Sequence, residues 1–148
     1  MQENTHKYTI LITEDKVINF LFLEILLKKQ IDLGCAIIHA KNGAEAVEIC
    51  KKNDDINLVL MDLKMPVMDG FEAVKLIKEI RPKLPIVAQT AFSSIEDKEK
   101  VFAAGFNDFL SKPINKEALL DVINRQKEQK INKNLNIKFN YNISKKRN

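Results

Sequence analysis

Short apolar runs alternate along the chain with longer segments in which apolar residues recur at helical spacing. A strand buried on both faces reads as a short continuous apolar run, whereas a helix that covers a sheet shows one apolar face. The pattern therefore predicts strands and helices in strict alternation. The predicted strands are 8–13, 35–39, 57–61, 85–88 and 107–110, and the predicted helices are 16–31, 43–52, 70–80, 94–103 and 115–128.

This alternation, with connections of a few residues, predicts an α/β fold. Repeated strand–helix units form a parallel sheet with helices on both faces, and right-handed crossovers make the fold doubly wound. The common flavodoxin-like strand order 2-1-3-4-5 places the ends of the first and third strands side by side. We expect one such five-stranded domain over residues 8–128, preceded by an N-terminal extension at residues 1–7.

Residues 129–148 form a tail with a different pattern. Apolar residues occupy every second position from 135 to 143, which is typical of a strand with one apolar face. The richness of the tail in Asn and Lys instead favours disorder. In either case the last helix is expected to end near Lys127. A strand could add to a sheet edge of a second copy, so a homodimer is one alternative.

Charge separates the tail from the body. The whole chain of 148 residues has a net charge of +4, but residues 129–148 hold six basic and no acidic side chains. The remainder has 18 basic and 20 acidic residues, so charge does not favour nucleic-acid binding by the body. No apolar run reaches the ~18 residues of a membrane span, and no secretory-type apolar segment follows the N-terminus. We therefore expect a cytoplasmic protein without a membrane segment, with Cys35 and Cys50 as buried free thiols.

Candidate chemistry gathers at the predicted strand ends. Glu14 and Asp15 follow the first strand, and Asp62 follows the third. The carboxyl ends of parallel strands share one edge of a sheet, so these three carboxylates would crowd together. A hard cation such as Mg²⁺ relieves that repulsion and prefers oxygen ligands. The alternative for the first two acids is a favourable interaction with the dipole of the following helix.

Two further polar residues end strands at the same edge. Lys112 precedes Pro113, and a cis bond there could aim the lysine into the acidic cluster, where it would bind carboxylate or phosphoryl oxygens. Thr90 could donate its hydroxyl to a phosphoryl oxygen. The alternatives are a surface lysine and a threonine that caps the next helix.

Taken in their order along the chain, these strand-end residues and the segments around them resemble the receiver domain of two-component response regulators. The resemblance spans about residues 8–127, and segments 62–70 and 103–113 are most similar to receivers of hybrid sensor histidine kinases. The motifs that carry it are Glu14-Asp15, Asp62 with Met65-Pro66-Val67-Met68-Asp69-Gly70, Thr90-Ala91 and Lys112-Pro113.

The resemblance implies that Asp62 accepts a phosphoryl group from a phosphohistidine, supplied by a histidine kinase or a histidine phosphotransfer protein. It implies Mg²⁺ bound directly by Asp15, through water by Glu14, and by the backbone carbonyl of Lys64. The other implied roles are phosphoryl contacts for Thr90 and Lys112, a switch aromatic at Phe109 and a cis proline at Pro113.

The implied function is a phosphorylation-driven switch that acts on an unnamed downstream protein. It is not an enzyme with turnover, although it catalyses its own phosphoryl transfer and slow autodephosphorylation. Lys64 and Phe92 flank the phosphoryl site at variable positions, which leaves the lifetime of the acyl phosphate open.

Two other classes fit parts of the pattern. A Mg²⁺-dependent phosphatase with Asp62 as nucleophile would want a second acid two residues later, where this chain has Lys64. A flavodoxin-like cofactor binder would hold phosphate after the first strand, where Glu14 and Asp15 would repel it.

Overall fold

The computed structural model describes residues 8–30, 35–91 and 94–146, so the predicted N-terminal extension lies outside the described residues. The chain divides into two compact units, residues 1–113 and 114–148. In the part of the chain that the structure describes, no helix is long and apolar enough to cross a membrane.

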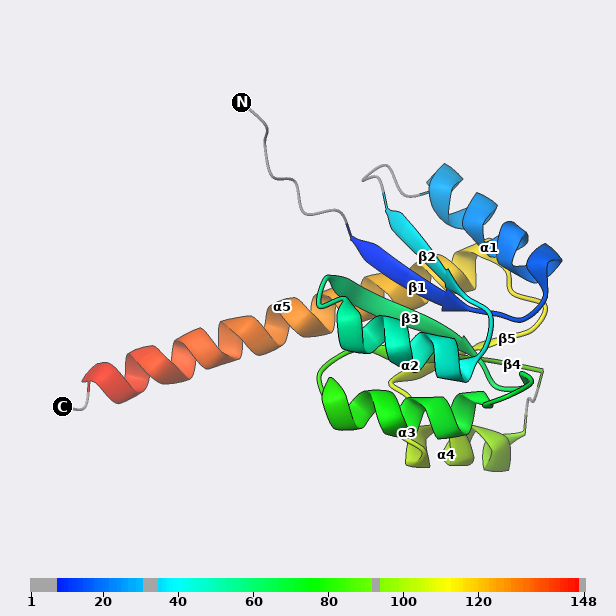
Figure 1. Ribbon diagram of the computed structural model, residues 1–148. Helices are drawn as coiled ribbons and strands as arrows, with labels where there is room; N and C mark the ends of the chain where they lie inside the picture. Colours follow the sequence, from blue (N-terminus) through cyan, green and yellow to red (C-terminus); the bar gives the residue numbers. More distant parts are fainter. Residues whose placement is uncertain (1–7, 31–34, 92–93, 147–148) are drawn as a thin grey trace. The chain divides into compact units, whose positions relative to one another are not determined.

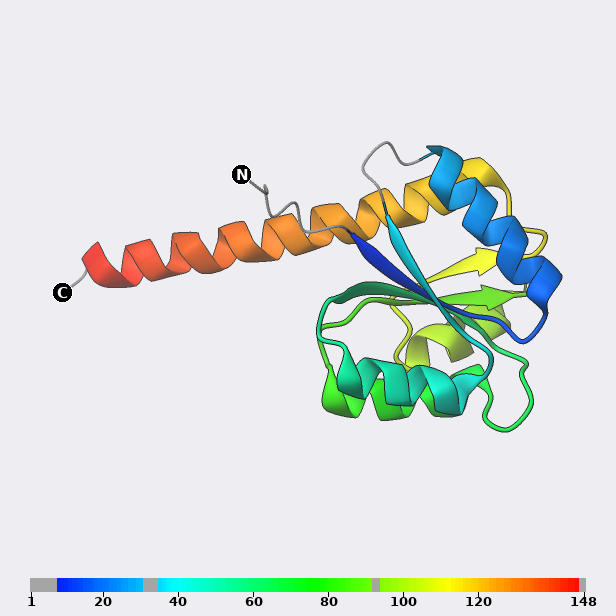
Figure 2. The same cartoon turned by 45° about the horizontal axis from the view of Figure 1, so that its top comes forward.

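The first unit is built on a five-stranded parallel sheet (Figure 1). Its order, β2-β1-β3-β4-β5, confirms the predicted topology. Figure 2 shows α1 on one face of the sheet and α2, α3 and α4 on the other. The strands are β1 (Thr9–Thr13), β2 (Ala36–Ala40), β3 (Ile56–Asp62), β4 (Ile86–Thr90) and β5 (Asp108–Ser111). The helices of this unit are α1 (Val17–Gln30), α2 (Gly43–Lys52), α3 (Gly70–Ile80) and α4 (Ile95–Ala103).

The main core lies between the sheet and helices α2 to α4. Strands β1 and β4 are buried along their whole length, which explains the short apolar runs that they contain, Ile10–Ile12 and Ile86–Ala88. Alternate residues of each strand enter this core, among them Leu11 of β1, Met61 of β3 and Ala88 of β4. Neither cysteine forms a disulfide, and only Cys50 is buried; Cys35 is half-buried, contrary to the prediction.

The connection from β3 to α3 is tightly constrained. Asp69 caps α3, because its Oδ1 accepts a hydrogen bond from the Glu72 N–H at 2.9 Å. The Gly70 N–H donates to the Leu63 carbonyl at 3.0 Å, and a Cβ at position 70 would collide with the Asp62 carbonyl oxygen. The Asp69-Gly70 pair therefore lets the chain fold back directly beside the end of β3.

Val67, in the same connection, has a left-handed backbone conformation with a φ of 71°, and its side chain is 83% exposed. A β-branched residue is strained there, by about 1–2 kcal/mol, and little packing depends on the exposed side chain. Val67→Asn is expected to raise the free energy of unfolding by about 0.5–1 kcal/mol, because Asn tolerates this region. Urea denaturation measures it, with Val67→Ala as the control that keeps most of the strain. Equal stability of the Asn and Ala variants would contradict this reasoning.

The second unit contains one long helix, α5 (Lys116–Lys146), which corrects the predictions for the tail. The last helix does not end near Lys127, and residues 135–143 form neither a strand nor a disordered segment. Apolar positions that alternate also recur every fourth residue, as Leu135 and Phe139 do, and a helix satisfies that spacing equally well. The chain has no Gly or Pro after Pro113, so nothing stops the helix. Dimerisation by strand exchange thereby loses its basis.

Candidate functional site

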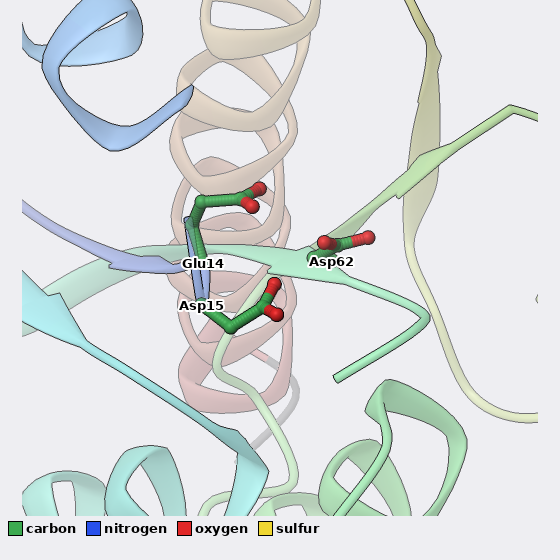
Figure 3. A group of neighbouring side chains, drawn as sticks. All are labelled: Glu14, Asp15 and Asp62. Atoms are coloured by element: carbon green, nitrogen blue, oxygen red, sulfur yellow. The ribbon is translucent and has the colours of Figure 1, made fainter. Parts of the chain in front are cut away.

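Three carboxylates meet at the carboxyl edge of the sheet (Figure 3). Glu14 and Asp15 follow β1 directly, and Asp62 is the last residue of β3, the neighbouring strand. One carboxylate oxygen from each residue lies within 4.8 Å of the others. Glu14 and Asp62 are buried, and Asp15 is the most accessible of the three. The predicted crowding of these acids is therefore present in the structure.

Glu14 is held by the first residues after the strand. Its Oε1 accepts hydrogen bonds from the Lys16 N–H and from Asn19 Nδ2, both at 3.3 Å. Among the residues that the structure describes, Oε2 has no hydrogen-bond partner, although the side chain is fully buried. A buried carboxylate oxygen without a donor, next to two further carboxylates, fits a hard divalent cation such as Mg²⁺.

The environment of Glu14 changes its acidity. Burial, and then the charge of Asp62, raise the pKa of the Glu14 carboxyl above its ordinary value of 4.5, while Lys112 and the two hydrogen bonds oppose the rise. The folded state therefore holds the proton more tightly than the unfolded chain. The contribution of Glu14 to stability is present below pH 4.5 and is lost as the pH rises through the folded pKa.

Glu14→Gln is accordingly expected to stabilise the metal-free protein at neutral pH, because Gln keeps an acceptor for Asn19 and carries no charge. The gain should shrink as the pH falls through the raised pKa of folded Glu14 toward 4.5, because Glu14 itself then becomes neutral. Urea denaturation in the presence of a chelator, at several pH values, measures this dependence. Glu48→Gln, an exposed acid of α2, is the control. A gain that does not change with pH would show that charge is not its cause.

Lys112 is the cation of the site. It follows β5, and its Nζ donates to Asp62 Oδ1 at 3.0 Å and lies 3.9 Å from Glu14 Oε2. Its backbone N–H donates to the Thr90 carbonyl at 2.8 Å. The peptide bond between Lys112 and Pro113 is cis, the isomer that the resemblance implied. Lys112 is therefore an ion-pair partner inside the cluster and not a surface lysine.

A cavity of about 170 Å³ opens at these strand ends. A space of this size holds several water-sized groups. The lining residues include Asp15, Asp62, Lys64, Thr90 and Lys112. The structure thus brings the predicted acceptor, cation and hydroxyl residues to one hollow.

Phe109 is not among the residues that line this cavity. Its half-buried ring packs edge-on against Phe102 of α4, with centroids 6.0 Å apart, and Lys98 Nζ lies 5.2 Å from the ring centre. Phe109, the predicted switch aromatic, therefore faces α4 and belongs to the strand that leads to Lys112. Phe92, the other flanking position, lies outside the described residues.

Two residues of the site were missed in the sequence. Asn19 bonds to the Glu14 carboxylate, and its signal was a polar residue inside an otherwise apolar helical run. His39 of β2 places its Nε2 2.7 Å from the Glu14 carbonyl oxygen, and its signal was the one ionisable residue in an apolar strand.

A doubly wound sheet with an acidic triad and a lysine at its carboxyl edge is the arrangement that the receiver motifs implied. The family described as “Response regulator receiver domain” matches residues 10–124. The chain belongs to this family and is a receiver domain of two-component signalling.

The relatives and solved structures similar to the chain agree. It is 41% identical over 124 residues to “Hybrid signal transduction histidine kinase B” of Dictyostelium discoideum; the match covers 75% of this chain and 6% of that protein. It is 39% identical, with a TM-score of 0.69, to a chain of the co-crystal structure of the Saccharomyces cerevisiae histidine phosphotransfer protein Ypd1 and the receiver domain of Ssk1, covering 76% of this chain and 83% of that one.

A third similarity concerns the metal. The receiver domain of sensor histidine kinase PA1611 from Pseudomonas aeruginosa PAO1, solved with a magnesium ion in its active site cleft, is 31% identical with a TM-score of 0.72. That match covers 81% of this chain and 97% of the other. By contrast, the chain spans less than a tenth of the length of the first curated relatives it matches.

Proposed function

We propose that Asp62 is the phosphoacceptor of this receiver domain. The observation that carries the proposal is the contact of Lys112 Nζ with Asp62 Oδ1 at 3.0 Å, at the mouth of a cavity shared with Asp15 and Thr90. In the transfer, an Asp62 carboxylate oxygen forms a bond to phosphorus as the bond from phosphorus to the donor's imidazole nitrogen breaks. The imidazole leaves with the electron pair of that bond.

The surrounding residues supply positioning and charge. Phosphoryl transfer to a carboxylate depends on in-line geometry and on stabilisation of the phosphoryl oxygens. We assign the Lys112 ammonium and the Thr90 hydroxyl to those oxygens. The transfer is catalysed within the domain, without turnover, and slow autodephosphorylation ends the signal. Membership of the receiver family sets aside the phosphatase and cofactor-binding alternatives.

The proposed metal is Mg²⁺. Asp15 and Asp62 would bind it directly, Glu14 through water, and the Lys64 backbone carbonyl would complete the protein ligands. When bound, the ion neutralises charge on the carboxylates and on the incoming phosphoryl group. Three observations support this assignment: Glu14 Oε2 accepts no hydrogen bond among the described residues, the three carboxylates lie within 4.8 Å, and a similar receiver structure holds magnesium.

The proposed donor is a histidine kinase or a histidine phosphotransfer protein. Helix α1 starts directly after the acidic pair and exposes apolar side chains at spacings that keep them on one face, with Ile18 81% exposed. Such a face suits an apolar partner helix that carries the phosphohistidine. The exposed residues are Val17, Ile18, Leu21, Phe22 and Ile25. The proposal includes a cytoplasmic location and leaves the downstream partner unnamed.

Phosphorylation is proposed to shift the domain between two states. Thr90 would move toward the phosphoryl oxygens and Phe109 would turn inward, away from Phe102, which changes the surface of α4 and β5. The phosphoryl group favours the second state because it contacts Thr90 only there.

The test is treatment of the protein with a small phosphodonor, with and without Mg²⁺. We expect one acid-labile phosphoryl group per chain that requires Mg²⁺, together with altered amide hydrogen exchange across the described part of residues 91–111. No label in the presence of Mg²⁺ would refute the proposed function. Label with exchange changes confined to the vicinity of Asp62 would refute the switch alone.

A further inference from the structure

The geometry points to His39 as a positioning residue that holds the main chain of the acidic pair in place for metal binding. The inference rests on the proposed function in one respect, the assignment of Glu14 and Asp15 as metal residues. The His39 Nε2 lies 2.7 Å from the Glu14 carbonyl oxygen. A carbonyl oxygen only accepts, so Nε2 is the donor in this bond.

This hydrogen bond takes the place of a backbone hydrogen bond that the neighbouring strand would otherwise donate to the Glu14 carbonyl. The ladder between β1 and β2 ends at the Thr13–Ala40 pair, and the Glu14 N–H still donates to the Ala40 carbonyl at 3.0 Å. Beyond Ala40 the backbone no longer continues β2, because Asn42 already caps α2. The Glu14 carbonyl therefore takes its donor from a side chain of the edge strand.

The orientation of that carbonyl determines where the next residue starts. The Glu14 carbonyl and the Asp15 nitrogen belong to one planar peptide group, so fixing the oxygen fixes the plane. With the Glu14 N–H also bonded to β2, the peptide groups on both sides of Glu14 are tied to the edge strand. These two bonds fix the direction in which the Glu14 side chain leaves the backbone, and they fix the position of the Asp15 Cα, from which the second carboxylate starts.

Phe20 fixes the imidazole itself. The Phe20 and His39 rings are stacked, with centroids 3.8 Å apart and planes inclined by 8°. Phe20 lies in the first turn of α1, one residue after Asn19, which holds the Glu14 carboxylate at 3.3 Å. The start of α1 therefore supports Glu14 twice, at its side chain through Asn19 and at its main chain through the stacked His39.

Two substitutions separate the hydrogen bond from the ring. His39→Phe keeps an aromatic ring against Phe20 but removes the donor, whereas His39→Gln keeps an amide donor and removes the ring. We expect His39→Phe to weaken Mg²⁺ binding about fivefold, the equivalent of one hydrogen bond, and His39→Gln to change it less than about twofold. His39→Leu is a second variant without a donor, and Ile37→Val, two residues earlier in β2, is the control.

Calorimetric titration with Mg²⁺ gives the dissociation constant, and thermal unfolding with a chelator gives the metal-free stability. The inference holds if the variants without a donor bind Mg²⁺ more weakly than His39→Gln and Ile37→Val while remaining folded. It is overturned if all variants bind Mg²⁺ as the wild type does, or if only the variants without a donor fail to fold, because the residue would then be structural. Failure of the proposed function looks different: the wild type would bind Mg²⁺ and accept no phosphoryl group.

Discussion

Asp62→Asn is expected to abolish phosphorylation, with a loss of at least about 100-fold in the rate of labelling. Asn has nearly the same shape and still offers an oxygen to Lys112 Nζ, which contacts Asp62 Oδ1 at 3.0 Å in the wild type. It lacks the anionic oxygen that forms the bond to phosphorus. Labelling by a small phosphodonor with Mg²⁺, followed by intact-mass measurement and mild acid treatment, detects the difference.

The matched control is Asp69→Asn. Asp69 is an exposed carboxylate in the connection that follows Asp62, and Asn is an equally good helix cap, so fold and labelling should be retained. Full labelling of the Asp62 variant at another residue would refute the assignment of the acceptor. Equal loss in both variants would point to a general effect on the connection and not to the acceptor itself.

The sheet could be predicted because its sequence signals are independent of tertiary detail. Strands β1 and β4 are buried throughout, and each therefore contains a short apolar run, Ile10–Ile12 and Ile86–Ala88. The first predicted helix, 16–31, differs by one residue at each end from α1, Val17–Gln30. The order 2-1-3-4-5 is a common one for doubly wound sheets with right-handed crossovers, so its prediction needed no knowledge of side-chain contacts.

The same reasoning explains which part of the site could be foreseen. Glu14, Asp62 and Lys112 end parallel strands, and topology alone brings such ends together. The bond from His39 to the Glu14 carbonyl depends on a side-chain rotamer and on where β2 stops, which no periodicity records. The tail was misjudged because alternation at every second residue also contains the four-residue spacing of α5.

Asp15→Ala is expected to remove Mg²⁺ binding and, in the absence of metal, to stabilise the fold. Asp15 contributes one of the three carboxylates whose oxygens lie within 4.8 Å, and it is the most accessible of them to an ion from solution. Its removal lowers the repulsion on Asp62 and Glu14, which should raise the metal-free stability by roughly 1 kcal/mol in this partly exposed setting.

The two effects have opposite signs, which makes the experiment decisive. At a Mg²⁺ concentration about 100 times the dissociation constant, binding should stabilise the wild type by about 2.7 kcal/mol. The Asp15→Ala variant should gain nothing from the same addition, whereas Glu48→Ala, which removes an exposed acid from α2, should gain as much as the wild type. Calorimetric titration together with thermal unfolding, with and without Mg²⁺, measures both quantities. An unchanged Mg²⁺ affinity in Asp15→Ala would refute the metal assignment, since no other accessible carboxylate of the cluster could replace it.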